Sequence, residues 1–480
     1  MTSSRPLFYS LDLFSGCGGT ALGVETAGFH SIGHIEIDET AKKTLELNFG
    51  SSPLQSIRDA DGDVTKVDLK KMKKELAETG CLSLDLLVAS PPCQGFSAAG
   101  RAKLNSLNKD SCFSKDPRNK LYKSVVQYIS ILKPKALLFE NVPGMLNVRG
   151  MNFVEIFCQD VENLGYNVRC SVLNSAWYGV PQSRERVFVV AFRSDLGITP
   201  SFPLKSHNLD NVGGAWGQPI KNGVKWKTDK YYVSQESIGQ KKTPEVGVSV
   251  SDAFEDLPPF YEHLTIGYRA SRMKCEHQDY TSNTPSNKYC AKMRNWPGYS
   301  SNVVKDHFCR STPRDYIIFS KMNYGDMFPQ AVAIAQALWQ KKKAQFAKGR
   351  ISQLPKKSTV VPPYRLDCFP EKWQKLDPNK LACTLTAHLE KDGYSHIHFD
   401  HKQARTLTIR EAARLQSFPD GYQFNGPMGK VFKQIGNAIP PLVATAVAKR
   451  IFTDLNSLMN KSKKINNNKP QQNYEQLLNS

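Results

Sequence analysis

Short apolar runs and helical stretches alternate through the first 193 residues, and this alternation constrains the fold more than any other feature. The first run, residues 7–14, breaks into a glycine turn at 15–19, and residues 20–27 then follow a helical pattern. Repeated strand and helix units of this kind are typical of an α/β fold with a mostly parallel sheet. Ligands bind such a sheet at the carboxyl ends of its strands, so polar residues at those positions are candidate site residues.

Glu36 is the first of these candidates. It lies in the second predicted strand, residues 32–37, about 20 residues after the glycine turn, where comparable folds place an acid that binds ribose hydroxyls. An ordinary turn followed by a surface glutamate is the alternative interpretation. Asp63 is expected to end a third strand at residues 62–64 and to accept a hydrogen bond from an exocyclic amine, or else to cap a helix.

Cys93 follows two prolines at the end of the apolar run 84–89. The prolines restrict the backbone and end strand pairing, so we expect the thiol on a stiff loop at the carboxyl end of a strand. A buried structural cysteine is the common alternative for a free thiol. The polar stretch that follows, residues 100–115, is too long for a simple turn and has the length of a functional lid.

Glu140 ends the next predicted strand, residues 135–139. A carboxyl group there is expected near the cysteine at the end of a neighbouring strand, as an acid and nucleophile pair. Arg184 and Arg186 are two residues apart at the start of strand 187–192, so their side chains are expected to point the same way. They suit a phosphate or a base carbonyl, and a pair of solvated arginines is the alternative.

An excess of basic residues indicates a polyanionic partner. The chain carries 64 Lys and Arg against 44 Asp and Glu, a formal net charge of +20, and nucleic acid is the leading partner class on this ground. The 11 cysteines include no Cys-x-x-Cys spacing, so neither a disulfide framework nor a zinc cluster is predicted. We also expect no membrane span and no secretory signal, because no apolar run has the necessary length and position.

The pattern changes over residues 194–404, where tryptophans and tyrosines are interleaved with lysines and arginines in loop-rich sequence. Such interleaving suits nucleic-acid contact and also suits the core of a small irregular domain. We predict one helix here, at 330–346, and interpret its lysines 341–343 as a solvated helix end. Helical patterning resumes at 408–416 and again at 442–458.

Six blocks of the chain, taken together and in order, resemble the DNA (cytosine-5)-methyltransferase family. They are residues 12–19 (DLFSGCGG), 91–97 (PPCQGFS), 140–144 (ENVPG), 182–186 (QSRER), 405–420 and 434–441 (QIGNAIPP). A single block is weak support. All six in the family's order span almost the whole chain and make coincidence a poor explanation.

The resemblance implies a Rossmann-like, S-adenosylmethionine-dependent methyltransferase fold with a mostly parallel sheet, plus a smaller irregular target-recognition domain. Residues 1–193 then form the first part of the catalytic and cofactor-binding domain, and 194–404 form the target-recognition domain. Residues 405–459 return to complete the catalytic domain. The polar tail, residues 460–480, is expected to be disordered.

The resemblance also assigns catalytic roles. Cys93 adds to C6 of cytosine, protonated Glu140 stabilises the charge that develops toward N3, and Arg186 bonds the cytosine O2, with Arg184 beside it in the catalytic set. Because stacked neighbours cover the face of the base in duplex DNA, the cytosine is expected to be flipped out.

S-adenosylmethionine is the methyl donor that the resemblance implies, with no metal. The residues expected at the donor are Phe14, Gly16, Gly18, Gly19, Glu36, Asp63, Pro91, Leu121 and Asn437. The residues expected to contact DNA are Ser97, Arg101, Thr384 and Leu385. Because Asn437 lies near the far end of the chain, the C-terminal helix is expected to pack beside the first strand.

Double-stranded DNA is therefore the expected partner, in a monomeric, stand-alone enzyme of the restriction-modification type whose cognate endonuclease acts on the same site. Its expected location is the cytoplasm and nucleoid of a prokaryote, or the nucleus of a eukaryote. Two alternatives stay open. One is a tRNA cytosine methyltransferase of the same fold, although that branch typically has proline where this chain has Gly95. The other is a catalytically silent relative that binds DNA.

Overall fold

The computed structural model describes residues 8–78, 83–92, 121–148, 150–212, 230–265, 277–366 and 372–467. Three of the residues expected at the site, Cys93, Ser97 and Arg101, lie outside this part of the chain, and so does the lid expected at 100–115.

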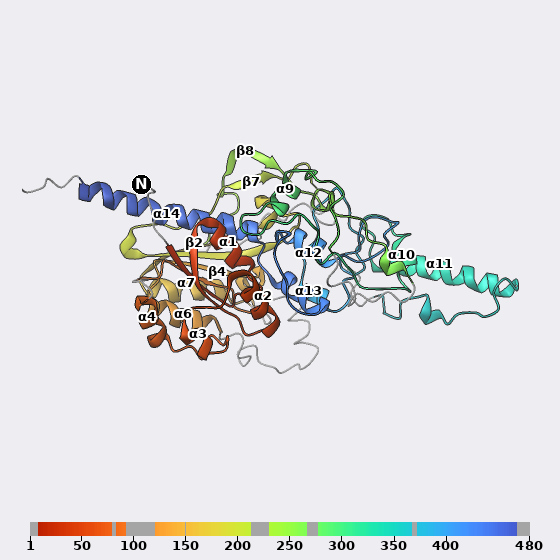
Figure 1. Cartoon of the computed structure of the whole chain (residues 1–480), viewed down its shortest axis with the longest axis horizontal. Coiled ribbons are helices and arrows are strands. Elements are labelled where there is room, and N and C mark those ends of the chain that lie inside the picture. Colours follow the sequence, from red (N-terminus) through yellow and green to blue (C-terminus); the bar gives the residue numbers. More distant parts are fainter. Residues whose placement is uncertain are drawn as a thin grey trace, which may run out of the picture.

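A six-stranded sheet forms the centre of the catalytic part (Figure 1). Its strands are β1 (Phe8–Leu13), β2 (Phe29–Ile35), β3 (Leu86–Ala89), β4 (Ala136–Asn141), β5 (Tyr166–Asn174) and β6 (Glu185–Arg193). Their order is β2-β1-β3-β4-β6-β5; the first four are parallel, and β6 runs antiparallel to both of its neighbours. The first residues of β6 therefore lie at the same edge as the carboxyl ends of β3 and β4. This arrangement confirms the mostly parallel α/β sheet.

Helices cover both faces of this sheet (Figure 1). On one face pack α4 (Leu69–Glu78), α6 (Leu121–Leu132) and α7 (Phe153–Asn163), and on the other pack α1 (Gly19–Ala27) and α14 (Pro441–Asn467). Leu87 of β3 belongs to the first core and Val88 to the second. A strand with both faces buried needs apolar side chains at every position, which is why residues 86–89 are all apolar instead of alternating, with the charged Asp85 just before the strand begins.

The C-terminal helix closes the catalytic part beside the first strand, as expected. Gly23 of α1 lies so close to α14 that an added Cβ would be 2.4 Å from the Cβ of Ala444. The Phe452 ring packs edge-on against Phe8 at 5.1 Å and against Phe29 at 5.4 Å between centroids. The helix continues to Asn467, beyond residue 460, where we expected order to end.

Part of the region expected to form a separate recognition domain packs on the catalytic sheet. The Cys170 amide of β5 donates to the Tyr231 carbonyl, and the Val233 amide donates to the Cys170 carbonyl, each at 2.8 Å. The same region also contains a two-stranded parallel sheet of β7 (Lys205–Asn208) and β8 (Gln240–Val246). The chain therefore still packs on the catalytic sheet as far as residue 233, which is 40 residues beyond the boundary expected at 193. The domain limits stay a prediction.

The remaining recognition region holds short helices and one long helix. Its elements are α8 (Val250–Phe254), α9 (Lys288–Arg294), α10 (Tyr316–Phe319) and α11 (Phe328–Ala347). The helix predicted at 330–346 is thus confirmed as α11, which projects from the rest of the molecule (Figure 1). Within the described ranges, no helix is both long and apolar enough to cross a membrane.

A buried network of arginines joins the recognition region to the returning C-terminal segment, through α12 (Ile409–Leu415). Arg405 donates from both Nη atoms to the Glu411 carboxylate, at 2.7 and 2.6 Å. Arg414 binds Asp420 at 2.6 Å and also pairs with Asp256, which belongs to the recognition region. All these side chains are fully buried. The block 405–420 is therefore structural in the described part of the molecule.

Candidate active site

Three strand ends meet at one edge of the sheet. Ala89 of β3 is in register with Phe139 of β4, so the chain leaves β3 directly beside Glu140. The Asn141 amide group donates to the Pro91 carbonyl at 3.2 Å, which holds the first proline against the end of β4. Cys93 lies outside the described residues, but the two prolines that precede it start from this edge.

Glu140 and Arg186 form an ion pair at this edge. The Arg186 Nε lies 3.1 Å from Glu140 Oε1, and Glu140 is only 8% exposed. Burial raises the pKa of Glu140, and the charges of Arg186 and Arg184 offset this only in part. Glu140 is therefore a carboxyl group that holds a proton to higher pH than an exposed glutamate does.

Arg184 is held by backbone carbonyls, and its place in the catalytic set stays a prediction. Its side chain does not share a direction with Arg186; it is 1% exposed and donates to the Leu385 carbonyl at 2.6 Å and to the Gly436 carbonyl at 3.2 Å. Because these donors are occupied by backbone carbonyls, Arg184 does not present them to a substrate. It instead ties the start of β6 to two distant segments of the chain.

Leu385 is held within the protein. Its side chain is fully buried, its amide donates to Gln182 Oε1 at 2.9 Å, and its carbonyl accepts from Arg184. The contact predicted between Leu385 and DNA stays a prediction. Thr384 is half-buried and donates to the Ser183 carbonyl at 2.7 Å, so its contact with DNA stays a prediction.

The glycine turn after β1 has the backbone that a donor site needs. Phe14, Gly16 and Gly18 have positive φ values of 59°, 55° and 85°. The Gly16 amide donates to Glu36 Oε2 at 2.8 Å, and the other carboxylate oxygen of Glu36 accepts from the Asp38 amide at 2.8 Å. Glu36 follows the end of β2 directly and is thus fixed against the turn. Burial raises its pKa.

No strand forms at residues 62–64, contrary to our prediction. These residues make a turn in which Gly62 has a φ of 78°, and an added Cβ there would lie 1.9 Å from the Glu36 carbonyl oxygen. Asp63 accepts from the amide and the hydroxyl of Thr65, at 3.0 and 2.7 Å. Only glycine permits this close approach, so the turn lies against the Glu36 backbone, with Asp63 as the next residue.

Asp12 is a residue that the sequence reasoning missed. Its carboxylate is 3% exposed, and neither oxygen has a hydrogen-bond partner in the described part of the chain. Burial raises the pKa of Asp12 to about 8; the neighbouring Ser15 side chain opposes this rise, and the nearby charge of Glu36 adds to it. A buried carboxyl without a partner either keeps its proton or receives a cation. The sequence signal that could have identified Asp12 is a charged residue inside the apolar run 7–14.

The segments that carry other residues expected at the donor contact one another from distant parts of the chain, and the roles of these residues stay a prediction. Asn437 is exposed at the end of α13 (Met428–Asn437), and Lys433 of that helix pairs with Asp38 at 2.8 Å. The Tyr128 hydroxyl of α6, the helix that begins with Leu121, donates to the Val64 carbonyl at 3.1 Å. Gly19 packs against the Ile439 carbonyl.

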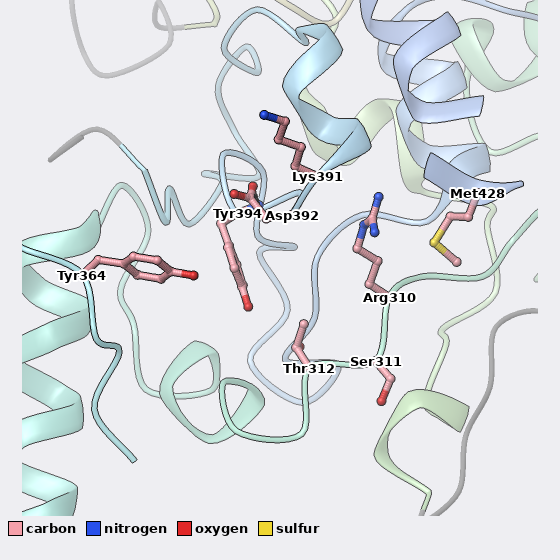
Figure 2. A pocket seen from close by; sticks show the side chains of 8 residues that line it. All are labelled: Arg310, Ser311, Thr312, Tyr364, Lys391, Asp392, Tyr394 and Met428. Carbon is pink, nitrogen blue, oxygen red and sulfur yellow. Dashed lines mark hydrogen bonds between the residues drawn. The ribbon is translucent and has the colours of Figure 1, made fainter. Parts of the chain in front are cut away.

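A hollow of about 600 Å³ lies in the recognition region, next to the start of α13 (Figure 2). It is lined by Arg310, Ser311, Thr312, Tyr364, Lys391, Asp392, Tyr394 and Met428. A second hollow of about 370 Å³ shares three of these residues, Tyr364, Asp392 and Tyr394. In the described residues no group of three or more His, Cys, Asp and Glu side chains is placed to hold a metal ion.

Comparison with known proteins gives consistent results. The family profile described as C-5 cytosine-specific DNA methylase matches residues 8–453. A candidate type II methyltransferase of Oceanobacillus iheyensis, M.OihORF3336P, is 36% identical over 451 residues, which cover 91% of this chain and 94% of the relative. The type II methyltransferase M.DdeI of Desulfomicrobium norvegicum is 29% identical over 455 residues, which cover 92% of this chain and 88% of the relative.

Among solved structures, a candidate DNA modification methyltransferase encoded within an E. coli prophage has a TM-score of 0.62 and 21% identity to this chain. The match covers 94% of this chain and 99% of the other. At this identity the likeness concerns the fold alone, and it confirms the Rossmann-like architecture expected from the sequence.

Proposed function

Because the chain belongs to the C-5 cytosine-specific DNA methylase family, we propose that it methylates C5 of a flipped-out cytosine within a specific duplex DNA sequence, through a covalent bond between Cys93 and C6. The observation that carries the proposal is the buried pair of Glu140 and Arg186, located at the strand end from which the cysteine loop departs.

The chemistry explains why a thiol and an acid are needed. C5 of cytosine is a poor nucleophile, so the Cys93 thiolate first adds its electron pair to C6, which makes C5 enamine-like. The C5 electron pair then forms the new bond to the methyl carbon, while the bond between that carbon and the sulfonium sulfur would break and its electrons would stay on the sulfur, which leaves as a neutral thioether. A base removes the C5 proton, the C5–C6 double bond reforms, and the thiolate leaves with its electron pair.

Glu140 and Arg186 hold the ring during these steps. The raised pKa of Glu140 favours the protonated carboxyl, which donates a hydrogen bond toward N3 as charge develops there. Arg186 keeps Glu140 in place through the ion pair at 3.1 Å, and its guanidinium nitrogens suit the cytosine O2.

The donor-binding edge fits S-adenosylmethionine, which supplies an electrophilic methyl group on a sulfonium. Glu36, fixed by two backbone amides, is suited to the ribose hydroxyls, and the positive φ of Gly16 opens the backbone to the ligand. Asp12 is a buried carboxyl without a partner among the described residues and suits a cationic group of the donor. Asp63, Pro91, Leu121 and Asn437 complete the proposed set.

The biological role we propose is that of a monomeric modification enzyme in the cytoplasm of a prokaryote, protecting DNA from an endonuclease that reads the same sequence. The names of the relatives support this proposal, since both are described as type II methyltransferases. The net charge of +20 suits duplex phosphates and predicts binding that weakens steeply as salt rises.

Methyl incorporation tests the proposal directly. Labelled S-adenosylmethionine should transfer its methyl group to duplex DNA and not to tRNA, and methylation-sensitive sequencing of the product should reveal one short motif. DNA that carries 5-fluorocytosine in this motif should trap a covalent adduct, because fluorine does not leave as a proton does. The adduct should be absent in Cys93→Ser. Transfer to tRNA alone would overturn the DNA assignment, and an adduct with Cys93→Ser would overturn the nucleophile.

A further inference from the structure

A basic arm projects from the recognition region. It consists of α11 and the segment that returns beside it, residues 328–366 (Figure 1). The root of the arm is anchored, because Phe328, Val332 and Ala335 pack with Trp373 in a small core. Beyond the root the helix leaves the protein: from 340 to 350 every side chain except Gln345 is exposed.

The charge of the arm is positive throughout. Residues 328–366 contain no Asp or Glu. Seven of the arm's cations have no carboxylate within ion-pair distance among the described residues: Lys341, Lys342, Lys343, Lys348, Arg350, Lys356 and Lys357. Elsewhere exposed lysines do find acids, as in the pairs Lys71 with Asp59 at 2.6 Å and Lys74 with Glu78 at 3.8 Å. A solvated helix face normally mixes both signs of charge.

The arm is held as one unit by an aromatic contact. The Nζ atoms of Lys343 on the helix and Lys357 on the returning segment lie 5.7 and 5.6 Å from the centre of the Trp339 ring. Clustered like charges repel one another and destabilise a helix. A bound polyanion would neutralise these charges and relieve the repulsion.

The root of the arm adjoins the large hollow. Tyr364, on the returning segment, lines both hollows, and Arg310 and Lys391 line the larger one (Figure 2). Arg310 is oriented toward this region by bonds from Nη2 to the carbonyls of Leu389 and Glu390. Two cations, Arg310 and Lys391, therefore lie between the start of α13 and the arm, together with the carboxylate of Asp392, which lines both hollows and pairs with Lys372 at 3.2 Å.

We propose that the basic arm is a second DNA-contact surface, which binds backbone phosphates of the duplex outside the recognised sequence. The proposal rests on the proposed function, because the duplex that the arm grips is the substrate docked on the recognition region. The arm would add affinity and widen the footprint on DNA without reading bases, since phosphate contacts carry no sequence information.

The test compares two triple variants that change the net charge equally. In K341Q/K342Q/K343Q the arm loses three lysines; in the control K70Q/K73Q/K74Q, α4 loses three exposed lysines. Binding to a duplex just longer than the methylated motif, and to one extended on both sides, is measured across a salt series. The slope of log affinity against log salt is negative. In the arm variant it should become shallower by about 2.7 on the extended duplex, at about 0.9 for each phosphate that the arm no longer neutralises.

On the short duplex, both variants should bind and methylate as the unchanged protein does. Equal slopes for the arm variant and the α4 control on the extended duplex would overturn the proposal, as expected if the arm binds an acidic protein instead. A second arm variant, K348Q/R350Q, changes other residues of the arm and so controls for a local folding defect in the first. It should make the negative slope shallower by about 1.8. If the unchanged protein methylates no duplex at all, the proposed function fails, whatever the slopes.

Discussion

At the scale of single residues, Glu140 offers a test of acid catalysis. Glu140→Gln keeps the size of the side chain but not the acidic proton, and we expect kcat to fall by roughly 10² to 10⁴. Burial raises the pKa of Glu140, so the protonated form is present at low pH and is lost as pH rises through the raised pKa.

The pH profile of kcat therefore separates this role from a structural one. The unchanged enzyme should lose activity on the alkaline side as Glu140 ionises, whereas Glu140→Gln should keep a flat residual rate there. An alkaline limb that persists unchanged in the variant would assign the titration to another group.

Asp12 makes a second prediction at this scale. Its pKa of about 8 means that the carboxyl is protonated below that pH in the absence of a ligand and charged above it. If a cationic group of the donor binds the charged form, donor affinity should rise about tenfold between pH 7 and pH 9.

Calorimetric titration of S-adenosylmethionine at the two pH values measures this difference. Asp12→Asn should weaken binding and remove the pH dependence, and the exposed control Asp279→Asn should behave like the unchanged protein. The same pH dependence in Asp12→Asn would show that Asp12 does not receive the cation.

At the scale of elements, α12 depends on its buried ion pairs. Burial alone would raise the pKa of Asp420, but the pair with Arg414 and the charge of Arg410 outweigh it and hold the pKa below its ordinary value. Arg414→Met removes the nearest cation from both buried aspartates and leaves them only more distant ones, Arg410 at 3.9 Å from Asp420 and Arg294 at 3.4 Å from Asp256 among the described residues, so the free energy of unfolding should fall by about 3–5 kcal/mol.

Chemical denaturation measures this loss. Arg450→Met removes a pair on α14 in which the arginine is exposed and Asp454 is half-buried, and it should cost less than the fully buried pair, about 1 kcal/mol. Because the folded pKa of Asp420 is depressed, the stability due to the pair is present above pH 4 and is lost as pH falls. Equal losses in the two variants would contradict the importance of the α12 network.

At the scale of the whole molecule, the catalytic part needs both ends of the chain. Truncation after Asn460 keeps the buried contacts of Val443, Val447, Ile451 and Leu455 with the sheet, and truncation after Pro440 removes them. We expect the first truncation to keep its Tm and methyl transfer, and the second to lose cooperative unfolding. Differential scanning calorimetry distinguishes them, and a stable protein that ends at Pro440 would contradict the closure by α14.

The sequence by itself determined the elements and the edge at which they end. Buried strands need apolar side chains and turns need glycine, so the pattern predicted β1, α1, β3, β4, β6 and α11 closely. The block order predicted the family, and the ends of β3 and β4 predicted that Glu140 lies beside the chain that leads to Cys93. These are local properties, which depend on residues that are neighbours in the sequence.

Only the tertiary structure decided which polar groups are available. Arg184 and Arg186 look alike in sequence, yet Arg184 donates to a carbonyl 252 residues away and Arg186 faces Glu140. Asp12 has no hydrogen-bond partner for its carboxylate within the described ranges, and Leu385 is buried. Both depend on contacts between distant parts of the chain. Local pattern predicts whether a residue is buried, but hydrogen bonds and pKa values depend on groups that folding brings together from distant parts of the chain.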